Sequence, residues 1–199
     1  MRVNDSCSHG QQLLLARHGE TADNAAHLIL GHRDPPLSDV GRRQAARLAG
    51  AAHEAGIISL WTSPLQRARQ TAAVVGELIG VPPTVLEGLV ESDRGAWEGQ
   101  PIDLIARHSP LLYEAFVGAE PGFAFPGGES LREQVQRTRD ALDLIAAGPS
   151  PSLIVAHAGT IRAALLALGR PAPPERELLH GQIVRISWPG SKPEPTSEG

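Results

Sequence analysis

The chain has 199 residues, of which 41% are hydrophobic and 20% charged, and its formal net charge is −4. This length fits one domain of ordinary size, and the charge argues against general nucleic-acid binding. The 18 basic residues are all Arg except Lys192, which lies in a Pro- and Glu-containing tail, and the only Cys is Cys7. These counts exclude a lysine-dependent phosphate loop, Schiff-base chemistry, a disulfide within the chain and a cysteine zinc ribbon.

Apolar patterns predict an alternation of strands and helices. Five short apolar runs are typical of buried strands, at 12–16, 57–61, 84–86, 153–156 and 182–188. Apolar residues at helical spacing predict longer helices over 37–55, 64–79, 129–147 and 160–168. Ser38 and Ser63 are the expected N-caps of the first two helices, with Pro64 at a first helical position.

The alternation favours an α/β fold with a mostly parallel, doubly wound sheet and helices on both faces. We expect a single domain over 11–188, with a Gly- and Pro-rich insertion at about 88–128 that holds short helices near 102–107 and 110–117. Residues 1–10 are predicted to be a flexible leader, and 189–199 a flexible tail. No signal peptide or membrane span is visible, so we expect a cytoplasmic protein that does not bind membranes.

Polar residues follow three of the predicted strands. Arg17 and His18 follow the first, Ser63 and then Arg67 follow the second, and His157 follows the fourth. Because the carboxyl ends of parallel strands meet at one edge of a sheet, these side chains should converge. Two histidines, two arginines and the amides of a helix N-terminus predict an anion site, and a phosphate ester is the natural ligand.

Longer motifs surround these residues along the chain. They are Arg17-His18-Gly19-Glu20-Thr21 with Asn24, Gly31-His32-Arg33-Asp34, Ser63-Pro64-Leu65-Gln66-Arg67, Glu91 with Gly95-Ala96-Trp97-Glu98-Gly99, Pro126-Gly127-Gly128-Glu129-Ser130, and Ala156-His157-Ala158-Gly159-Thr160. Together they resemble the histidine phosphatase superfamily, in its phosphoglycerate-mutase-like branch 1, over about residues 11–188. The resemblance implies a three-layer α/β/α sandwich and a cofactor-free, metal-independent reaction through phosphohistidine.

The resemblance also implies roles for particular residues. His18 matches the nucleophile, Glu91 the general acid and base, and His157 a second catalytic histidine that also binds phosphate. The other residues that match phosphate contacts are Arg17, Asn24, Arg67, Ala158 and Gly159. We expect burial and an anionic substrate to raise the pKa of Glu91 enough for it to protonate the leaving oxygen.

Three functions remain open at this point. Hydrolysis of a small-molecule phosphate ester, as in small phosphatases of the family, is favoured. Phosphoglycerate mutases carry Arg directly after the catalytic Glu and a Lys soon after, whereas Ser92 follows Glu91 here and no Lys precedes Lys192. A non-catalytic relative that binds phosphorylated ligands would be expected to lack the nucleophile or the acid. A homodimer is possible for any of the three.

Some residues receive structural interpretations instead. Glu20 is expected to cap a short helix, and Asp93 to be a solvated loop residue. His27, His32 and Asp34 match no compact zinc pattern. The chain's only Tyr and its three Phe fall between Tyr113 and Phe125, where they predict a small core under the long insertion, or alternatively an apolar wall for the leaving group.

Overall fold

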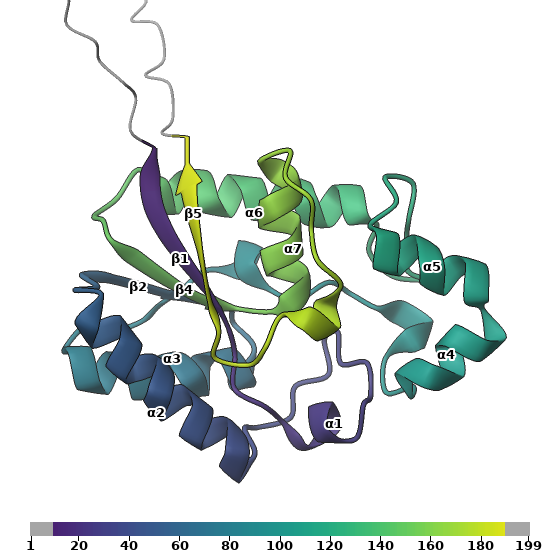
Figure 1. Ribbon diagram of the computed structural model, residues 1–199, viewed down its shortest axis with the longest axis horizontal. Helices are drawn as coiled ribbons and strands as arrows, with labels where there is room; N and C mark the ends of the chain where they lie inside the picture. The colour runs from purple at the N-terminus through teal and green to yellow at the C-terminus, as the bar shows by residue number, and fades with distance from the viewer. Residues whose placement is uncertain (1–9, 190–199) are drawn as a thin grey trace, which may run out of the picture.

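The computed structural model describes residues 10–189 (Figure 1). The strands are β1 (Gln11–Arg17), β2 (Ser59–Thr62), β3 (Thr84–Val85), β4 (Ser152–Ala156) and β5 (Ile183–Trp188). The α-helices are α1 (Ala22–Ala25), α2 (Asp39–Glu54), α3 (Gln66–Ile79), α4 (Ile102–His108), α5 (Pro110–Gly118), α6 (Leu131–Ala146) and α7 (Ala158–Ala167). Three 3₁₀ turns are η1 (Glu87–Leu89), η2 (Gly95–Trp97) and η3 (Glu175–Glu177).

The five strands form one sheet in the order β3-β2-β4-β1-β5, and only β5 runs antiparallel to its neighbour. Helices α2 and α3 pack on one face, whereas α6 and α7 pack on the other (Figure 1). The predicted three-layer α/β/α sandwich with a mostly parallel, doubly wound sheet is therefore confirmed. The short helices α4 and α5 of the insertion lie to one side of the sheet, at the right of Figure 1.

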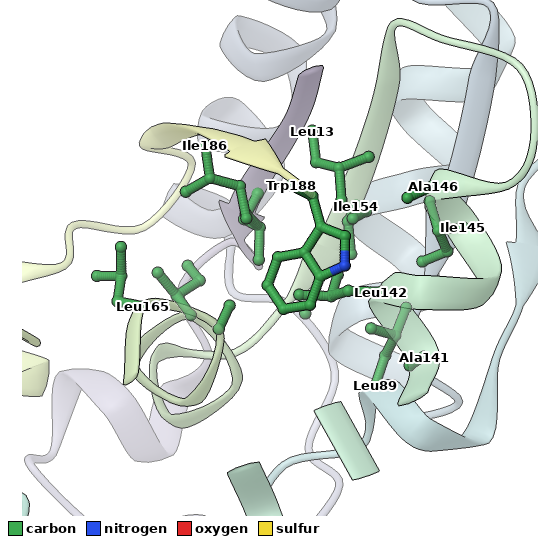
Figure 2. Packing of buried hydrophobic residues seen from close by; sticks show 14 of the residues in the cluster. Leu13, Leu89, Ala141, Leu142, Ile145, Ala146, Ile154, Leu165, Ile186 and Trp188 are labelled. Atoms are coloured by element: carbon green, nitrogen blue, oxygen red, sulfur yellow. The ribbon is translucent and has the colours of Figure 1, made fainter. Parts of the chain in front are cut away.

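Alternation along the central strands explains why both faces are covered. Leu13 and Leu15 of β1 point into the core under α6 and α7, whereas Leu14 and Ala16 point into the core under α2 and α3. Figure 2 shows the first of these cores, where Trp188 packs among side chains from β1, β4 and α6. The indole Nε1 of Trp188 also donates to Asp143 at 2.7 Å. Because successive strand residues face opposite sides, a near-continuous apolar run is needed for a doubly covered sheet.

Helix α3 begins later than predicted. Its first residue is Gln66, with Leu65 rather than Ser63 at the N-cap position, so Pro64 lies outside the helix. The free amide of Gln66 instead donates to the carboxylate of Asp34, at 2.7 and 2.9 Å. A carboxylate from a distant loop thus replaces the local Ser cap. Residues next to the helix in the sequence do not indicate this contact.

Other boundaries differ by one or two residues. Strand β2 begins at Ser59, because the amide of buried Ile57 still bonds the Ala52 carbonyl at the end of α2. Helix α7 starts at Ala158, directly after β4 and His157, rather than at Thr160. The predicted Ser38 cap of α2 is confirmed, since its Oγ accepts from the Gly41 amide at 3.0 Å. The single-domain boundaries stay a prediction, and the leader and tail fall almost wholly outside the described residues.

The loop after β1 packs directly on the first turn of α2. A Cβ added at Gly41 would overlap the carbonyl oxygen of Glu20, and one added at Gly19 would overlap the carbonyl oxygen of Gly41. This approach fixes the segment that carries His18.

We expect Gly41→Ala to lower the free energy of unfolding by about 2 kcal/mol or more, because backbone must move to admit a methyl group. Gly50, in the same helix, has no such neighbour within 4 Å. Gly50→Ala should therefore stabilise the protein by about 0.5–1 kcal/mol through helix propensity alone. Urea unfolding of both variants measures this contrast, and equal effects of the two substitutions would contradict it.

Candidate active site

The polar residues predicted at the strand ends come together because the parallel ladder continues one residue past each strand. The His18 amide donates to the Ala156 carbonyl at 2.9 Å, and the Ser63 amide donates to the Val155 carbonyl at 3.1 Å. His157 follows Ala156 directly, and the rings of His18 and His157 have their centroids 5.1 Å apart. Backbone pairing between β1, β4 and β2 therefore places the two imidazoles side by side.

The proton of His18 is placed by two contacts. Its Nδ1 lies 2.7 Å from the Gly19 carbonyl oxygen, which can only accept, so Nδ1 carries hydrogen. Its Nε2 lies 3.2 Å from the Nε donor of Arg67 and therefore presents its lone pair. Burial, followed by Arg67, His157, Arg17 and His180, lowers the pKa of His18 well below its ordinary value. His18 is consequently a neutral imidazole whose Nε2 lone pair accepts a hydrogen bond from Arg67, and this unprotonated nitrogen is the atom that can act as a nucleophile.

Arg67 is buried, and loop carbonyls hold its guanidinium. Nη1 donates to the Arg33 carbonyl at 2.6 Å, and Nη2 donates to the Gly31 carbonyl at 2.9 Å. The carboxylate of Asp34 lies 3.6 Å from Nη1. Burial lowers the pKa of Arg67 to about 10, against the influence of Glu91 and Asp34, so the side chain stays charged at neutral pH. The loop after α1, whose role the sequence left open, therefore orients Arg67.

Arg17 is held in a similar way by the segment before β5. Its Nη1 donates to the Leu178 carbonyl at 2.7 Å and to the Glu175 carbonyl at 3.4 Å. Its Nε is buried without a hydrogen-bond partner. Since a buried donor without a partner is unfavourable, this guanidinium retains capacity for an anion.

His157 is buried beside His18. Burial lowers its pKa well below the ordinary value, as do Arg67 and Arg17, so it is neutral. Its Nε2 lies 2.7 Å from Ser63 Oγ, and its Nδ1 is buried without a partner. Ser63, predicted as a helix cap, instead fixes the orientation of this ring.

Glu91 is buried and surrounded by donors. Its oxygens accept from the amides of Ser92 at 2.9 Å and Gly159 at 3.3 Å, and from Gln134 Nε2 at 3.3 Å. Arg94 Nη2 lies 3.4 Å away. Burial by itself raises the pKa of Glu91, but Arg94, Arg67 and the two amides outweigh it and hold the pKa below its ordinary value. Burial is therefore not enough to raise the pKa of Glu91 in the protein alone, and the upward shift expected with an anionic substrate stays a prediction.

The amide of Gly159, predicted to bind phosphate, is thus bonded to Glu91. A Cβ at this position would also overlap the Glu91 carboxylate. Gly159 is required here because the carboxylate approaches the first turn of α7 so closely.

The cap of α1 is formed by Thr21 and Asn24, not by Glu20. Thr21 is the N-cap of α1, and Asn24 Oδ1 accepts from its amide at 3.1 Å and its hydroxyl at 3.0 Å. The predicted cap Glu20 instead accepts from Ser38 Oγ at 3.0 Å. With its oxygen used in the cap, Asn24 retains its amide NH₂ group as a donor toward an anion.

A cavity of about 520 Å³ lies over this cluster. Six of the predicted site residues line it, namely Arg17, His18, Asn24, Arg67, Glu91 and Ala158. His157 and Gly159 are not among the lining residues. The wall also includes apolar side chains from the loop after α1 and from the segment before β5, namely Leu28, Ile29, Leu30, Leu178 and Leu179.

Arg94, Glu175 and His180 are among the lining residues that the sequence analysis missed. Arg94 and Glu175 form a partly buried ion pair at 2.6 Å. His180 Nδ1 donates to the His18 carbonyl at 2.9 Å, and burial lowers the pKa of His180 to about 4. Arg94 lies in a charged loop beside Asp93, and no motif marks Glu175 or His180 in the sequence.

The aromatic residues form the predicted small core rather than a cavity wall. Phe116, Phe123 and Phe125 are buried around Trp97, and none of them lines the 520 Å³ cavity. Within residues 10–189, no group of three or more His, Cys, Asp or Glu side chains could hold a metal ion. No helix in this part of the chain is long and apolar enough to cross a membrane.

Guanidinium groups around a neutral imidazole, at the carboxyl edge of a doubly wound sheet, are an arrangement suited to binding an anion such as phosphate. The chain belongs to the histidine phosphatase superfamily (branch 1), whose family model matches residues 13–196.

Comparison with curated proteins and solved structures gives similar proteins with different names. The chain is 37% identical over 172 residues to a protein of Yersinia pestis (strain Pestoides F) named probable phosphoglycerate mutase GpmB, covering 84% of this chain and 79% of that one. The structure resembles a mycobacterial glucosyl-3-phosphoglycerate phosphatase in complex with VO3, with TM-score 0.78, 28% identity and coverage of 89% and 91%. It also resembles the protein TTHB049 from Thermus thermophilus, with TM-score 0.70, 35% identity and coverage of 90% and 95%.

Three buried histidines with lowered pKa values make stability depend on pH. As pH falls below about 6.5, the unfolded chain protonates His18, His157 and His180, whereas the folded protein does not until lower pH. We therefore expect the midpoint of thermal unfolding to fall between pH 7 and pH 4.

In His180→Gln this dependence should weaken, because the side chain no longer titrates while its amide can still donate to the His18 carbonyl. The same substitution at His53, an exposed residue of α2, is the matched control. Identical pH profiles for the two variants would contradict the prediction.

Proposed function

We propose that this protein is a metal-independent phosphomonoesterase that hydrolyses a small-molecule phosphate ester through a phosphohistidine on His18, with Glu91 as general acid and base. The observation that carries the proposal is the state of His18. Its Nδ1–H is fixed by the Gly19 carbonyl, so Nε2 is unprotonated and its lone pair accepts from the Nε–H of the buried Arg67 guanidinium. A neutral imidazole in a cationic pocket combines a nucleophile with charge stabilisation for phosphoryl transfer.

In the first step, His18 Nε2 attacks phosphorus and the ester P–O bond breaks, while Glu91 gives its proton to the leaving oxygen. In the second step, water attacks phosphorus, the P–N bond breaks, and Glu91 takes a proton from the water. Arg17, Arg67 and the Asn24 amide would neutralise the phosphoryl oxygens, and His157 would support them from beside His18.

Because the pKa of Glu91 is lowered in the protein alone, Glu91 would become protonated when the substrate binds. A phosphate bound between Arg17 and Arg67 offsets the cations that hold the carboxylate ionised. Its negative charge therefore raises the pKa of Glu91 when a proton donor is needed.

Hydrolysis is favoured over mutase chemistry by the residues after Glu91. Ser92 stands where mutases carry Arg, and Arg94 is committed to Glu91 and Glu175. No Lys precedes Lys192 to hold a second substrate group. Phosphoryl transfer between positions of a phosphoglycerate is the second candidate, because similar curated proteins bear the mutase name.

Turnover of 4-nitrophenyl phosphate, unchanged by a chelator, is the expected outcome of the primary test. His18→Ala should lower this turnover by roughly 10³-fold or more and abolish the acid-labile phosphoenzyme, because the nucleophile is gone. His53→Ala, at an exposed position, is the matched control and should retain both.

Phosphoenzyme in His18→Ala would overturn the assignment of the nucleophile. Phosphate exchange between glycerate positions without net hydrolysis would establish the mutase instead. Tight vanadate binding without any turnover would indicate a non-catalytic relative.

Glu91→Gln separates leaving-group protonation from phosphate binding. An alkyl alkoxide needs a proton when it leaves, whereas 4-nitrophenolate does not. We expect kcat for an alkyl phosphate to fall by about 10²-fold or more and kcat for 4-nitrophenyl phosphate to fall much less. Asp93→Asn, on the same loop, is the control and should change neither rate. Equal losses on both substrates in Glu91→Gln would argue against the acid role.

A further inference from the structure

A buried group of charged residues lies beside Glu91, outside the phosphate-binding cluster. Arg94 is 4% exposed, and its Nη2 lies 3.4 Å from Glu91 Oε2 and 2.6 Å from Glu175 Oε1. One guanidinium nitrogen is therefore shared between the proposed general acid and a second carboxylate from η3. Because both carboxylates compete for the same cation, the charge of each affects the other.

The guanidinium of Arg94 packs on the aromatic core of the insertion, which fixes its position. Its guanidinium carbon lies 4.9 Å from the Phe125 ring centroid and 5.2 Å from that of Phe116. Phe116 also lies under Arg162, at 5.3 Å, and Arg162 reaches Glu175 at 4.0 Å. Planar guanidinium groups stack well on aromatic rings, so Arg94 keeps its place while its two carboxylate partners change charge.

We propose that Arg94 is a positioning residue that is shared between Glu91 and Glu175, so that it determines when Glu91 holds its proton. Glu175 limits the effect of Arg94 by competing for the same Nη2. This role deepens the proposed function and rests on Glu91 being the general acid.

Charged and titratable groups lie around Glu91 on several elements, including His32, whose Nε2 lies 2.9 Å from the Glu91 carbonyl oxygen. Arg94 lies on its own loop, Arg67 comes from α3, Arg17 from the end of β1, and Arg162 from α7. The neutral donors are Ser92, Gly159 and, from α6, Gln134. Arg94 is the largest of the charged influences that lower the pKa of Glu91, acting against burial.

Because of this arrangement, the two partners should have opposite effects. Removing the positive charge of Arg94 leaves Glu91 buried with less compensation, so its proton is held to higher pH. Removing the negative charge of Glu175 leaves Arg94 to act on Glu91 alone, so the proton is lost at lower pH. Residues with only a structural role would not shift the titration in opposite directions.

The test compares Arg94→Met, Arg94→Lys and Glu175→Gln with the wild-type protein. The pH dependence of kcat for an alkyl phosphate reports the general acid in the enzyme–substrate complex. We expect its alkaline limb to move up by about one pH unit or more in Arg94→Met, and down in Glu175→Gln. Arg94→Lys keeps the charge and should restore most of the wild-type profile. With 4-nitrophenyl phosphate, which needs no proton on its leaving group, the three profiles should differ much less.

A second measurement does not depend on turnover. Infrared difference spectra between each protein and its Glu91→Gln counterpart follow the protonated Glu91 carboxyl as pH changes. Opposite displacements of this signal in Arg94→Met and Glu175→Gln would support the proposal even if no ester were hydrolysed, in which case the proposed function alone would fail.

Three results would overturn the role of Arg94. They are titrations that shift in the same direction in both variants, titrations that do not shift in folded protein, and a rise in KM for Arg94→Met with an unchanged pH profile. The last would mean that Arg94 contacts the substrate directly.

Discussion

The main constraint on this structure comes from four guanidinium groups next to two neutral imidazoles; Arg67, Arg94 and Arg162 are buried and Arg17 is half-buried. Arg17, Arg67, Arg94 and Arg162 cannot be buried unless protein atoms replace water around them. Backbone carbonyls of the loop after α1, of the segment before β5 and of the end of α5 do so for three of them. The conformations of the loops at the carboxyl edge of the sheet are therefore coupled to the charges they surround.

The same constraint divides the site into two halves. Carbonyl oxygens satisfy part of Arg67 and Arg17 without cancelling their charge, so these side chains remain attractive to a phosphate group. Carboxylates satisfy Arg94, and its charge is largely used inside the protein. The first half therefore suits anion binding, and the second suits control of the proton on Glu91. The second half also depends on the small aromatic core of the insertion, which supports Arg94 and Arg162 through Phe116.

Prediction from sequence was most successful where a local signal exists. Arg17, His18 and His157 lie at the ends of apolar strands, and the strand-end rule for parallel sheets brings them together. Local signals failed where a distant group took over the expected role. Asp34 replaces the Ser63 cap of α3, and Ser63 instead bonds His157. Glu175 and His180 carry no motif, and they reach the cavity only because β5 pairs with β1 and returns the chain to that edge.

The sequence by itself determined the alternating α/β architecture and predicted an anion site built on Arg, since the 18 basic residues include a single Lys, which lies in the tail. Those features follow from composition, apolar period and residue order. Only the tertiary structure decided the charge state of the site. Whether His157 is neutral, whether Glu91 is ionised and which carboxylate Arg94 prefers all depend on burial and on contacts between segments far apart in the chain. Electrostatic effects depend on the distance in space between charged groups, and the positions of two residues along the chain do not give that distance.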